Sequence, residues 1–366
     1  MFNERALREL ASIQAEGPIL SVYLNVDPKQ RTAEEYKLKL RELLKCVEDQ
    51  VDPADIAAIR HYVEYHYDWS GRGLVGFSRA AEEIWYIYPL AVPVRSGVTV
   101  ARRPYISPLV ELDGLYGRYV VSVVDSQGGK FYYFQMGELV TEKEVKGEDF
   151  QHRKGRGSSV VGMRGGSQLP GRHEKELVSR NLKETAAALT DFCQVHKPRQ
   201  LLLAGSDHTV AHFSDVLSAP LENLVVGTFP ANVDTGEVEI RELAQKLLEE
   251  LHQAHQAKVV NALVTAAAKG KNGVIGLDGT LSVTHEGRVQ VLVVERDYHQ
   301  PGYRCTGCGY LTTQELDKCV FCGKQFSEIP DAVEALVTQV VDMGGTVEVM
   351  DDETMADVRI GALLRY

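Results

Sequence analysis

The sequence predicts a mixed α/β (α+β) protein built from three domains. Its length of 366 residues corresponds to two or three domains at about 150 residues each. A hydrophobic fraction of 44% beside 25% charged residues is typical of a globular chain and excludes wholesale disorder. Apolar residues alternate in some stretches and recur every three to four residues in others, which predicts strands interspersed with helices.

The charge balance limits the partners that the protein can have. There are 40 Lys and Arg residues against 51 Asp and Glu residues, a formal net charge of -11. This charge argues against bulk attraction to nucleic acid or to an anionic membrane, so any contact with nucleic acid is local. No apolar run of about 18 residues exists, so we expect no membrane partner. The charged, amphipathic N-terminus is unlike a signal peptide, and we expect a cytoplasmic protein.

The first domain is predicted over residues 1–115, as an α/β domain with a helical hairpin. Alternation predicts its strands, and apolar positions on one helical face predict its helices. The strands are expected at 19–26, 73–77 and 84–90, and the helices at 36–47 and 54–65. Asp52 and Pro53 break the hairpin, while Pro104, Pro108, Gly114 and Gly117 predict a linker after the domain.

The middle domain is predicted over residues 116–260. A three-stranded meander comes first, and helices and strands alternate after it. The expected strands are 119–124, 131–135, 139–145, 201–204 and 224–229, and the expected helices are 174–194, 209–217 and 238–268. This element order is that of an RNase H-like sheet.

The third domain is predicted over residues 261–366, as an α/β domain with an inserted zinc ribbon at 303–325. The expected strands are 273–277, 281–283, 289–294 and 346–350, and the expected helix is 332–341.

Four of the six cysteines form the metal-binding pattern of this insert. They lie in two CxxC pairs ten residues apart, each followed by a glycine, and are Cys305, Cys308, Cys319 and Cys322. Four thiolates fill a tetrahedral shell, so the pattern predicts a structural zinc ion, with disulfides or free thiols as the alternative. Cys46 and Cys193 stand alone on predicted helices, where buried packing is expected of them.

A basic, glycine-rich loop is predicted over residues 151–173. It contains six glycines, no Asp or Glu, and five cations: Arg153, Lys154, Arg156, Arg164 and Arg172. The cations suit phosphate groups, and the glycines let a backbone approach a ligand closely. A solvated insertion without function is the alternative. A nucleotide-binding P-loop fits poorly, because no GxxxxGK[ST] pattern is present.

The tract Arg164-Gly165-Gly166-Ser167-Gln168, on this loop and before a charged helix, resembles the Gly-Gly-Gln loop of archaeal and eukaryotic translation termination factors. The zinc insert and the terminal GALLRY are similar to features of that superfamily and of its relative Pelota. The chain is thereby identified as a member of the bacterial archaeo-eukaryotic release factor family, which implies a bacterial source.

The resemblance implies a ribosomal A-site factor that hydrolyses the ester of peptidyl-tRNA. It assigns Gly165, Gly166 and Gln168 to catalysis and the loop cations to ribosomal RNA at the peptidyl-transferase centre. A translational GTPase is a further candidate partner, and the sequence does not reveal whether one delivers the factor. No Ser/His/Asp or Cys/His arrangement competes for the role of a catalytic site, and His173, His208 and His212 are expected to be structural or surface residues.

Two departures keep alternatives open. Ser167 intervenes before Gln168, and the predicted hairpin loop 48–52 is acidic, without the family's stop-codon motifs. Codon-independent ribosome rescue by hydrolysis is therefore one hypothesis. A hibernation or recycling factor that occupies the A site without hydrolysis is the other. A zinc-dependent nucleic-acid module acting off the ribosome is disfavoured by the net charge.

Overall fold

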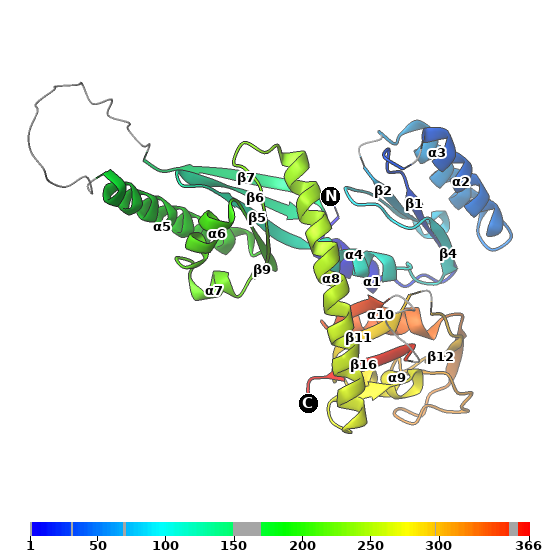
Figure 1. Cartoon of the computed structure of the whole chain (residues 1–366). Coiled ribbons are helices and arrows are strands. Elements are labelled where there is room, and N and C mark those ends of the chain that lie inside the picture. The colour runs from blue at the N-terminus through cyan, green and yellow to red at the C-terminus, as the bar shows by residue number, and fades with distance from the viewer. Residues whose placement is uncertain (1, 31, 69–70, 149–169, 297, 351–357) are drawn as a thin grey trace, which may run out of the picture. The chain divides into compact units, whose positions relative to one another are not determined.

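The computed structural model describes residues 2–30, 32–68, 71–148, 170–296, 298–350 and 358–366, shown in Figure 1. The chain forms two compact units. Unit 1 combines residues 1–117 with 252–366, and unit 2 is the continuous segment 118–251. The fold is mixed α/β, as the sequence predicts. Among the described residues, no helix is long and apolar enough to cross a membrane.

The N-terminal part of unit 1 is a four-stranded antiparallel sheet with the order β3-β2-β1-β4. Its elements are α1 (Glu4–Ser12), β1 (Ile19–Asn25), α2 (Ala33–Cys46), α3 (Pro53–Tyr65), β2 (Gly73–Arg79), a 3-10 turn (Ala80–Glu82), β3 (Ile84–Leu90), β4 (Gly97–Ala101) and α4 (Ser107–Tyr116). Helices α2 and α3 form the predicted hairpin, and their apolar faces share one core with β1. The second helix begins at Pro53, and the Asp52 carboxylate accepts a hydrogen bond from the Ala54 N–H at 2.9 Å, which is a standard N-cap.

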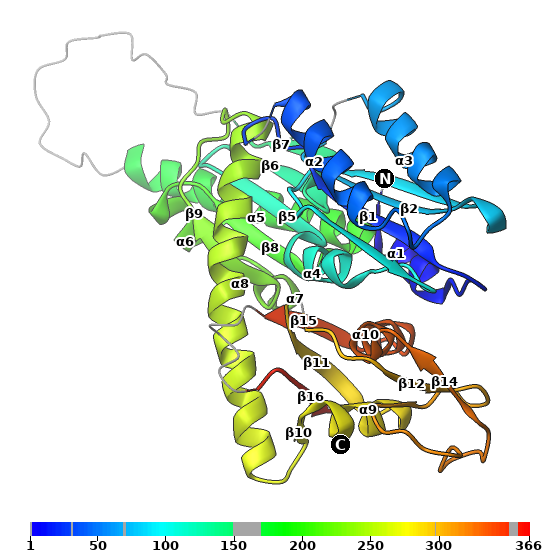
Figure 2. The same ribbon diagram turned by 90° about the vertical axis from the view of Figure 1, so that its right-hand side faces the viewer.

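The C-terminal part of unit 1 contains two further sheets. One has the order β10-β16-β11-β15 and the other the order β13-β12-β14. The elements are β10 (Gly273–Ile275), α9 (Leu277–His285), β11 (Val289–Glu295), β12 (Gly302–Cys305), β13 (Leu311–Thr312), β14 (Phe326–Ile329), α10 (Ala332–Asp342), β15 (Thr346–Met350) and β16 (Ile360–Leu364). Figure 2 shows the second half of α8 (Glu237–Ala268) along one side of this four-stranded sheet and α9 and α10 along the other.

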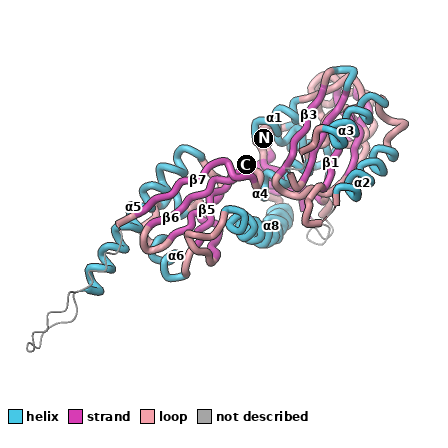
Figure 3. Tube along the Cα trace, turned by 90° about the horizontal axis from the view of Figure 1, so that it is seen from above, coloured by secondary structure: helices cyan, strands magenta, loops and turns pink. Residues whose placement is uncertain are grey.

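Unit 2 is built on a five-stranded sheet with the order β7-β6-β5-β8-β9. The first three strands form an antiparallel meander, and β5, β8 and β9 run parallel. The elements are β5 (Arg118–Val124), β6 (Gly128–Gln135), β7 (Glu138–Lys146), α5 (Pro170–His196), β8 (Gln200–Ala204), α6 (Asp207–Ser214), α7 (Ala219–Glu222), β9 (Val225–Phe229) and the first half of α8. Figure 3 shows α5 lying beside β5, β6 and β7.

Alternation along these strands separates two faces of the unit 2 sheet. Val120 and Phe131 share a core with Leu189 and Phe192 of α5. Because successive side chains of a strand point to opposite faces, Tyr119 belongs to the other face. The first half of α8 has Ile240, Ala244 and Leu248 buried, and a Cβ on Gly227 of β9 would lie 3.0 Å from Leu247, so this half of the helix packs against the sheet.

Two predicted elements were wrong. The linker expected at residues 104–117 contains the helix α4, because Pro108 stands in its first turn, where proline is tolerated, and Leu109 is buried. The strand expected at 281–283 lies inside the helix α9. There the Thr280 and Thr284 hydroxyls each donate to the carbonyl four residues earlier, so both threonines satisfy their polar atoms within a helix.

Cys46 also departs from the prediction. It is exposed at the end of α2, off the face that Leu40 and Leu44 bury, whereas Cys193 is buried as expected. Burial raises the pKa of the Cys193 thiol to about 11.

Candidate functional site

The basic loop leaves unit 2 between β7 and α5. The sequence-predicted residues Gly165, Gly166, Gln168, Arg153, Lys154, Arg156 and Arg164 lie outside the described residues. Arg172 falls within α5, but its side chain is also outside the description. The structure therefore positions the base of this loop, and the assigned residues themselves stay a prediction.

Asn181 of α5 binds the segment that follows β7, where the chain leaves for the loop. Its side chain is 1% exposed, and its Oδ1 accepts a hydrogen bond from the Glu148 N–H at 3.1 Å. Its Nδ2 donates to the carbonyls of Ser126 and Glu148, both at 3.2 Å. A Cβ on Gly147 would lie 2.4 Å from this amide. A buried amide with all of these bonds made is costly to disturb, so the exit of the chain from β7 is tied to α5.

The sequence analysis did not find Asn181. Its position in the sequence could have indicated it, because Asn181 stands on the apolar face of a helix, next to Leu182. The polar atoms of an asparagine in such a place need hydrogen-bond partners from a neighbouring backbone. Thr185, one turn further along, is buried on the same face and donates to the Asn181 carbonyl at 2.8 Å.

The described part of α5 nearest the loop carries exposed charge of both signs. Arg180 lies 3.3 Å from Glu148 and 3.1 Å from Glu184, with its side chain 63% exposed. Lys175 and Lys183 are exposed on the same helix. Ion pairs this exposed contribute little to stability, so these cations are accessible to a polyanion.

The hairpin loop of unit 1 is acidic in the structure as in the sequence. Glu48, Asp49 and Asp52 are exposed between α2 and α3, while Val47 and Val51 are buried beneath them. The apolar residues anchor the turn, and the carboxylates give its surface a negative charge. Such a surface repels phosphate groups.

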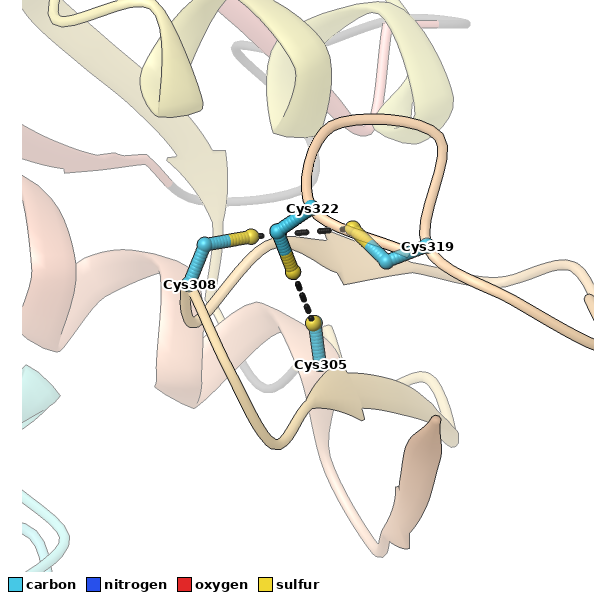
Figure 4. Close-up of side chains that lie close together, drawn as sticks. All are labelled: Cys305, Cys308, Cys319 and Cys322. Atoms are coloured by element: carbon cyan, nitrogen blue, oxygen red, sulfur yellow. Dashed lines mark hydrogen bonds between the residues drawn. The ribbon is translucent and has the colours of Figure 1, made fainter. Parts of the chain in front are cut away.

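The four CxxC cysteines converge on one point, as Figure 4 shows. Their Sγ atoms all lie within 4.8 Å of one another. The Cys305–Cys322 and Cys308–Cys319 sulfur pairs are 3.3 Å and 3.6 Å apart. A disulfide needs about 2.05 Å, whereas a tetrahedral shell with metal–sulfur bonds of about 2.3 Å places its sulfurs about 3.8 Å apart. The donor set fits a metal ion.

The two CxxC turns share one backbone pattern. In each turn the first cysteine N–H donates to the carbonyl five residues on, and the glycine four residues on donates back to the cysteine carbonyl. These distances are 2.8 and 3.1 Å at Cys305, and 2.8 and 2.9 Å at Cys319. Gly309 and Gly323 have φ values of 76° and 71°, a conformation that favours glycine. The glycines predicted after each pair are therefore explained by the turn itself.

The electrostatics of the cluster favour a bound cation. Desolvation raises the pKa of Cys305, but hydrogen bonds, led by those from the Cys308 and Gly307 N–H groups, lower it overall to about 6. Desolvation and the neighbouring sulfurs raise the pKa of Cys308 to about 12. The first thiolate thus forms readily, and its negative charge opposes the deprotonation of a second cysteine. A divalent cation would offset the negative charge of several thiolates.

Comparison with known proteins gives one family-model match, to the middle of the chain. Residues 104–267 match the family model described as bacterial archaeo-eukaryotic release factor family 10. The matched segment includes α4, the loop and the sheet of unit 2. No curated protein matches the chain.

Three solved structures align with low identity. Archaeoglobus fulgidus Pelota is 15% identical over 100% of this chain and 92% of its own, with a TM-score of 0.34. S. cerevisiae Dom34, described as a translation termination-like factor interacting with Hbs1, is 10% identical over 100% and 93%, with a TM-score of 0.40. The archaeal translation termination factor aRF1 is 14% identical over 100% and 99%, with a TM-score of 0.27. These scores are too low to carry a conclusion about fold or function.

Proposed function

We propose that this chain, whose residues 104–267 match the model of bacterial archaeo-eukaryotic release factor family 10, is a ribosomal A-site factor that hydrolyses peptidyl-tRNA independently of the codon. The observation that carries the proposal is the family match itself, because the matched segment contains the basic loop with Gly165, Gly166 and Gln168. The Asn181 contacts support it, since they tie the chain at the end of β7, from which the loop leaves, to α5.

The reaction is the attack of water on the ester that joins the peptide to the tRNA. The ribosome positions the ester, so the factor must supply a slender probe that orients water. Gly165 and Gly166 keep the backbone thin, a backbone N–H beside Gln168 would stabilise the developing oxyanion, and the Gln168 side chain would position water. No general base from the protein is needed in this scheme.

The expected partners are the ribosomal RNA of the peptidyl-transferase centre and the peptidyl-tRNA. The cations proposed to contact RNA phosphates are Arg153, Lys154, Arg156, Arg164 and Arg172. Exposed Lys175 and Lys183 extend the positive charge along α5. Delivery by a translational GTPase is part of the same proposal.

Independence from the codon rests on the hairpin loop between α2 and α3. Its exposed carboxylates, Glu48, Asp49 and Asp52, would be repelled by the phosphates of a decoding site. A factor with this loop is better suited to stalled ribosomes than to stop codons.

We propose zinc for the four-cysteine site, with a structural role. Four thiolates leave no open coordination position, so the metal would not take part in hydrolysis. The strands β12, β13 and β14 around it would form a zinc ribbon, in which the metal substitutes for a core too small to fold alone. The strand order of unit 2 likewise supports an RNase H-like middle domain, and we retain domain limits of 1–115, 116–260 and 261–366.

A second function is favoured by one specific feature. Ser167 separates the glycine pair from Gln168, which shifts the glutamine by one residue from the superfamily pattern. A factor whose glutamine is misplaced would occupy the A site without hydrolysis, as a hibernation or recycling factor.

Peptide release from purified stalled ribosomes separates these functions. We expect the wild-type protein to release labelled peptide equally with stop, sense or no codon in the A site. Gly166→Ala should abolish release while binding persists, and Gly162→Ala, in the same loop, is the matched control that should retain release. A strong preference for stop codons would indicate termination. Binding without release in every case would favour the hibernation function.

The electrostatic part of the proposal is tested by binding alone. Ribosome affinity should fall as salt rises, and replacing Arg164 and Arg172 together by Ala should reduce the slope of log affinity against log salt by roughly one to two. An unchanged slope in this double variant would exclude a role for the loop cations in binding.

A further inference from the structure

Unit 1 contains a pocket of about 440 Å³ where β4 and the residues around β14 meet. Both strands lie at the edge of their sheets. We call it the β4–β14 pocket, and it is lined by residues of the α1–β1 turn, the α2 end, β4 and its following segment, β12, β14 and the start of α10. The volume is within the range of about 300–1,000 Å³ that small-molecule sites occupy.

One wall of the pocket is apolar. Val98 and Val100 of β4 line it from one side, and Ile329 and Pro330 line it from the other. Val98 and Val100 are only partly buried against the core beneath them. An apolar wall that protein atoms do not cover favours a ligand with an apolar or flat body.

Three arginines line the same pocket, and they are Arg102, Arg103 and Arg304; Arg102 is exposed, whereas the other two are partly buried. Burial lowers the pKa of Arg103, and the positive charge of Arg304 lowers it further, with Asp342 acting in the opposite direction. The Arg103 guanidinium donates to the Ala11 carbonyl at 3.4 Å and to the Gln14 Oε1 at 3.2 Å, both neutral groups. Within the described part of the chain, neither Arg103 nor Arg304 has a carboxylate within ion-pair distance.

The two less exposed acidic side chains of the pocket, Asp331 and Glu334, already have hydrogen-bond partners. Asp331 caps α10 by accepting from the Val333 N–H at 2.9 Å, and its other oxygen contacts His299 at 2.6 Å. Glu334 accepts from the Ile106 N–H at 2.7 Å. Glu328 is exposed. The partly buried guanidiniums of Arg103 and Arg304 therefore remain for an incoming anion, with exposed Arg102 beside them.

We propose that the β4–β14 pocket binds a small organic phosphate the size of a nucleoside monophosphate, with its phosphate between Arg103 and Arg304 and its apolar body against Val98, Val100 and Ile329. A phosphate has enough oxygens for two guanidinium forks, whereas a carboxylate is saturated by one. The apolar wall accounts for an organic body in addition to the anion. This site is independent of the proposed hydrolysis, because it lies entirely within unit 1.

Calorimetric titration of the full-length protein with AMP, adenosine and inorganic phosphate tests the proposal. We expect AMP to bind and inorganic phosphate to bind with an affinity at least about tenfold lower. The affinity of adenosine should also be at least about tenfold lower than that of AMP, because adenosine lacks the charge-assisted hydrogen bonds of the phosphate. Arg103→Gln and Arg304→Gln should each lower the affinity for AMP at least about tenfold. Arg60→Gln, an exposed arginine of the same unit outside the pocket, is the matched control and should leave AMP binding unchanged.

Val100→Trp provides a variant that keeps both arginines. It should fill the apolar side and abolish AMP binding while weak phosphate binding persists. Circular dichroism and metal content check that Arg304→Gln, next to Cys305, still folds. Three results would each overturn the proposal. They are an absence of AMP binding, equal affinities for AMP and inorganic phosphate, and an affinity for AMP that is unchanged in Arg103→Gln and Val100→Trp.

Discussion

Glu334 should make the stability of unit 1 fall as the pH rises towards neutrality. This carboxyl lies on α10 and joins the two sequence segments of unit 1, because it accepts from the Ile106 N–H at 2.7 Å and from the Ser107 hydroxyl. It is fully buried. Burial raises its pKa from 4.5 to about 7, against the opposing effect of these hydrogen bonds, and Asp331 adds to the rise.

The sign follows from the direction of the shift. A group with a raised pKa in the folded state takes up its proton more readily there, so its contribution is complete below pH 4.5 and is lost as the pH rises through about 7. With about 1.36 kcal/mol per pKa unit, the loss between about pH 5 and about pH 8 is about 2.5 kcal/mol. Above that range the contribution is constant.

Glu334→Gln removes the titration and keeps an acceptor for the Ile106 N–H. We therefore expect the difference in free energy of unfolding, variant minus wild type, to rise by about 2.5 kcal/mol between about pH 5 and about pH 8. Urea unfolding followed by tryptophan fluorescence is the assay. Both tryptophans of the chain lie within residues 1–117, so the signal reports unit 1.

The control is Glu328→Gln, which alters an exposed glutamate near the same junction. Its pH dependence should match that of the wild type, and the histidines common to all three proteins cancel in the comparison. If Glu334→Gln and the wild type change stability with pH to the same extent, the reasoning about this buried carboxyl is refuted.

The cysteines give three further tests. Cys308→Ser should reduce the metal content from one ion per chain to almost none, measured by elemental analysis of protein purified without chelator; metal-free wild type would contradict the site. Gly307→Ala would place a Cβ 2.9 Å from the Cys322 sulfur, so metal should be retained but lost faster to a chelator, and an unchanged rate of loss would argue against this contact. In the native protein, a maleimide should label exposed Cys46 and spare Cys193, whose burial raises its pKa to about 11; equal labelling by mass spectrometry would show that Cys193 is accessible.

The sequence alone determined the elements whose signals are local. Alternation placed the meander of unit 2, and helical spacing together with Asp52 and Pro53 placed the α2–α3 hairpin. The sequence also predicted the cluster of four cysteines, because a few consecutive residues determine a CxxC turn followed by glycine.

Local signals failed where another part of the chain decided the outcome. Pro108 read as a linker residue, yet α4 forms because Leu109 is buried in unit 1. Thr280 and Thr284 suited a strand, yet their hydroxyls are satisfied inside α9.

Only the tertiary structure decided the long-range contacts. The Glu334 carboxyl meets the Ile106 N–H across 228 residues of sequence, and Arg103, from the segment after β4, lines one pocket with Arg304 of β12. No periodicity or spacing encodes such pairs, because Glu334, Arg103 and Arg304 each look locally like an ordinary charged residue and Ile106 looks like an ordinary apolar one. Burial and the loss of water around those charges, which give each pair its chemical meaning, arise only when distant segments pack together.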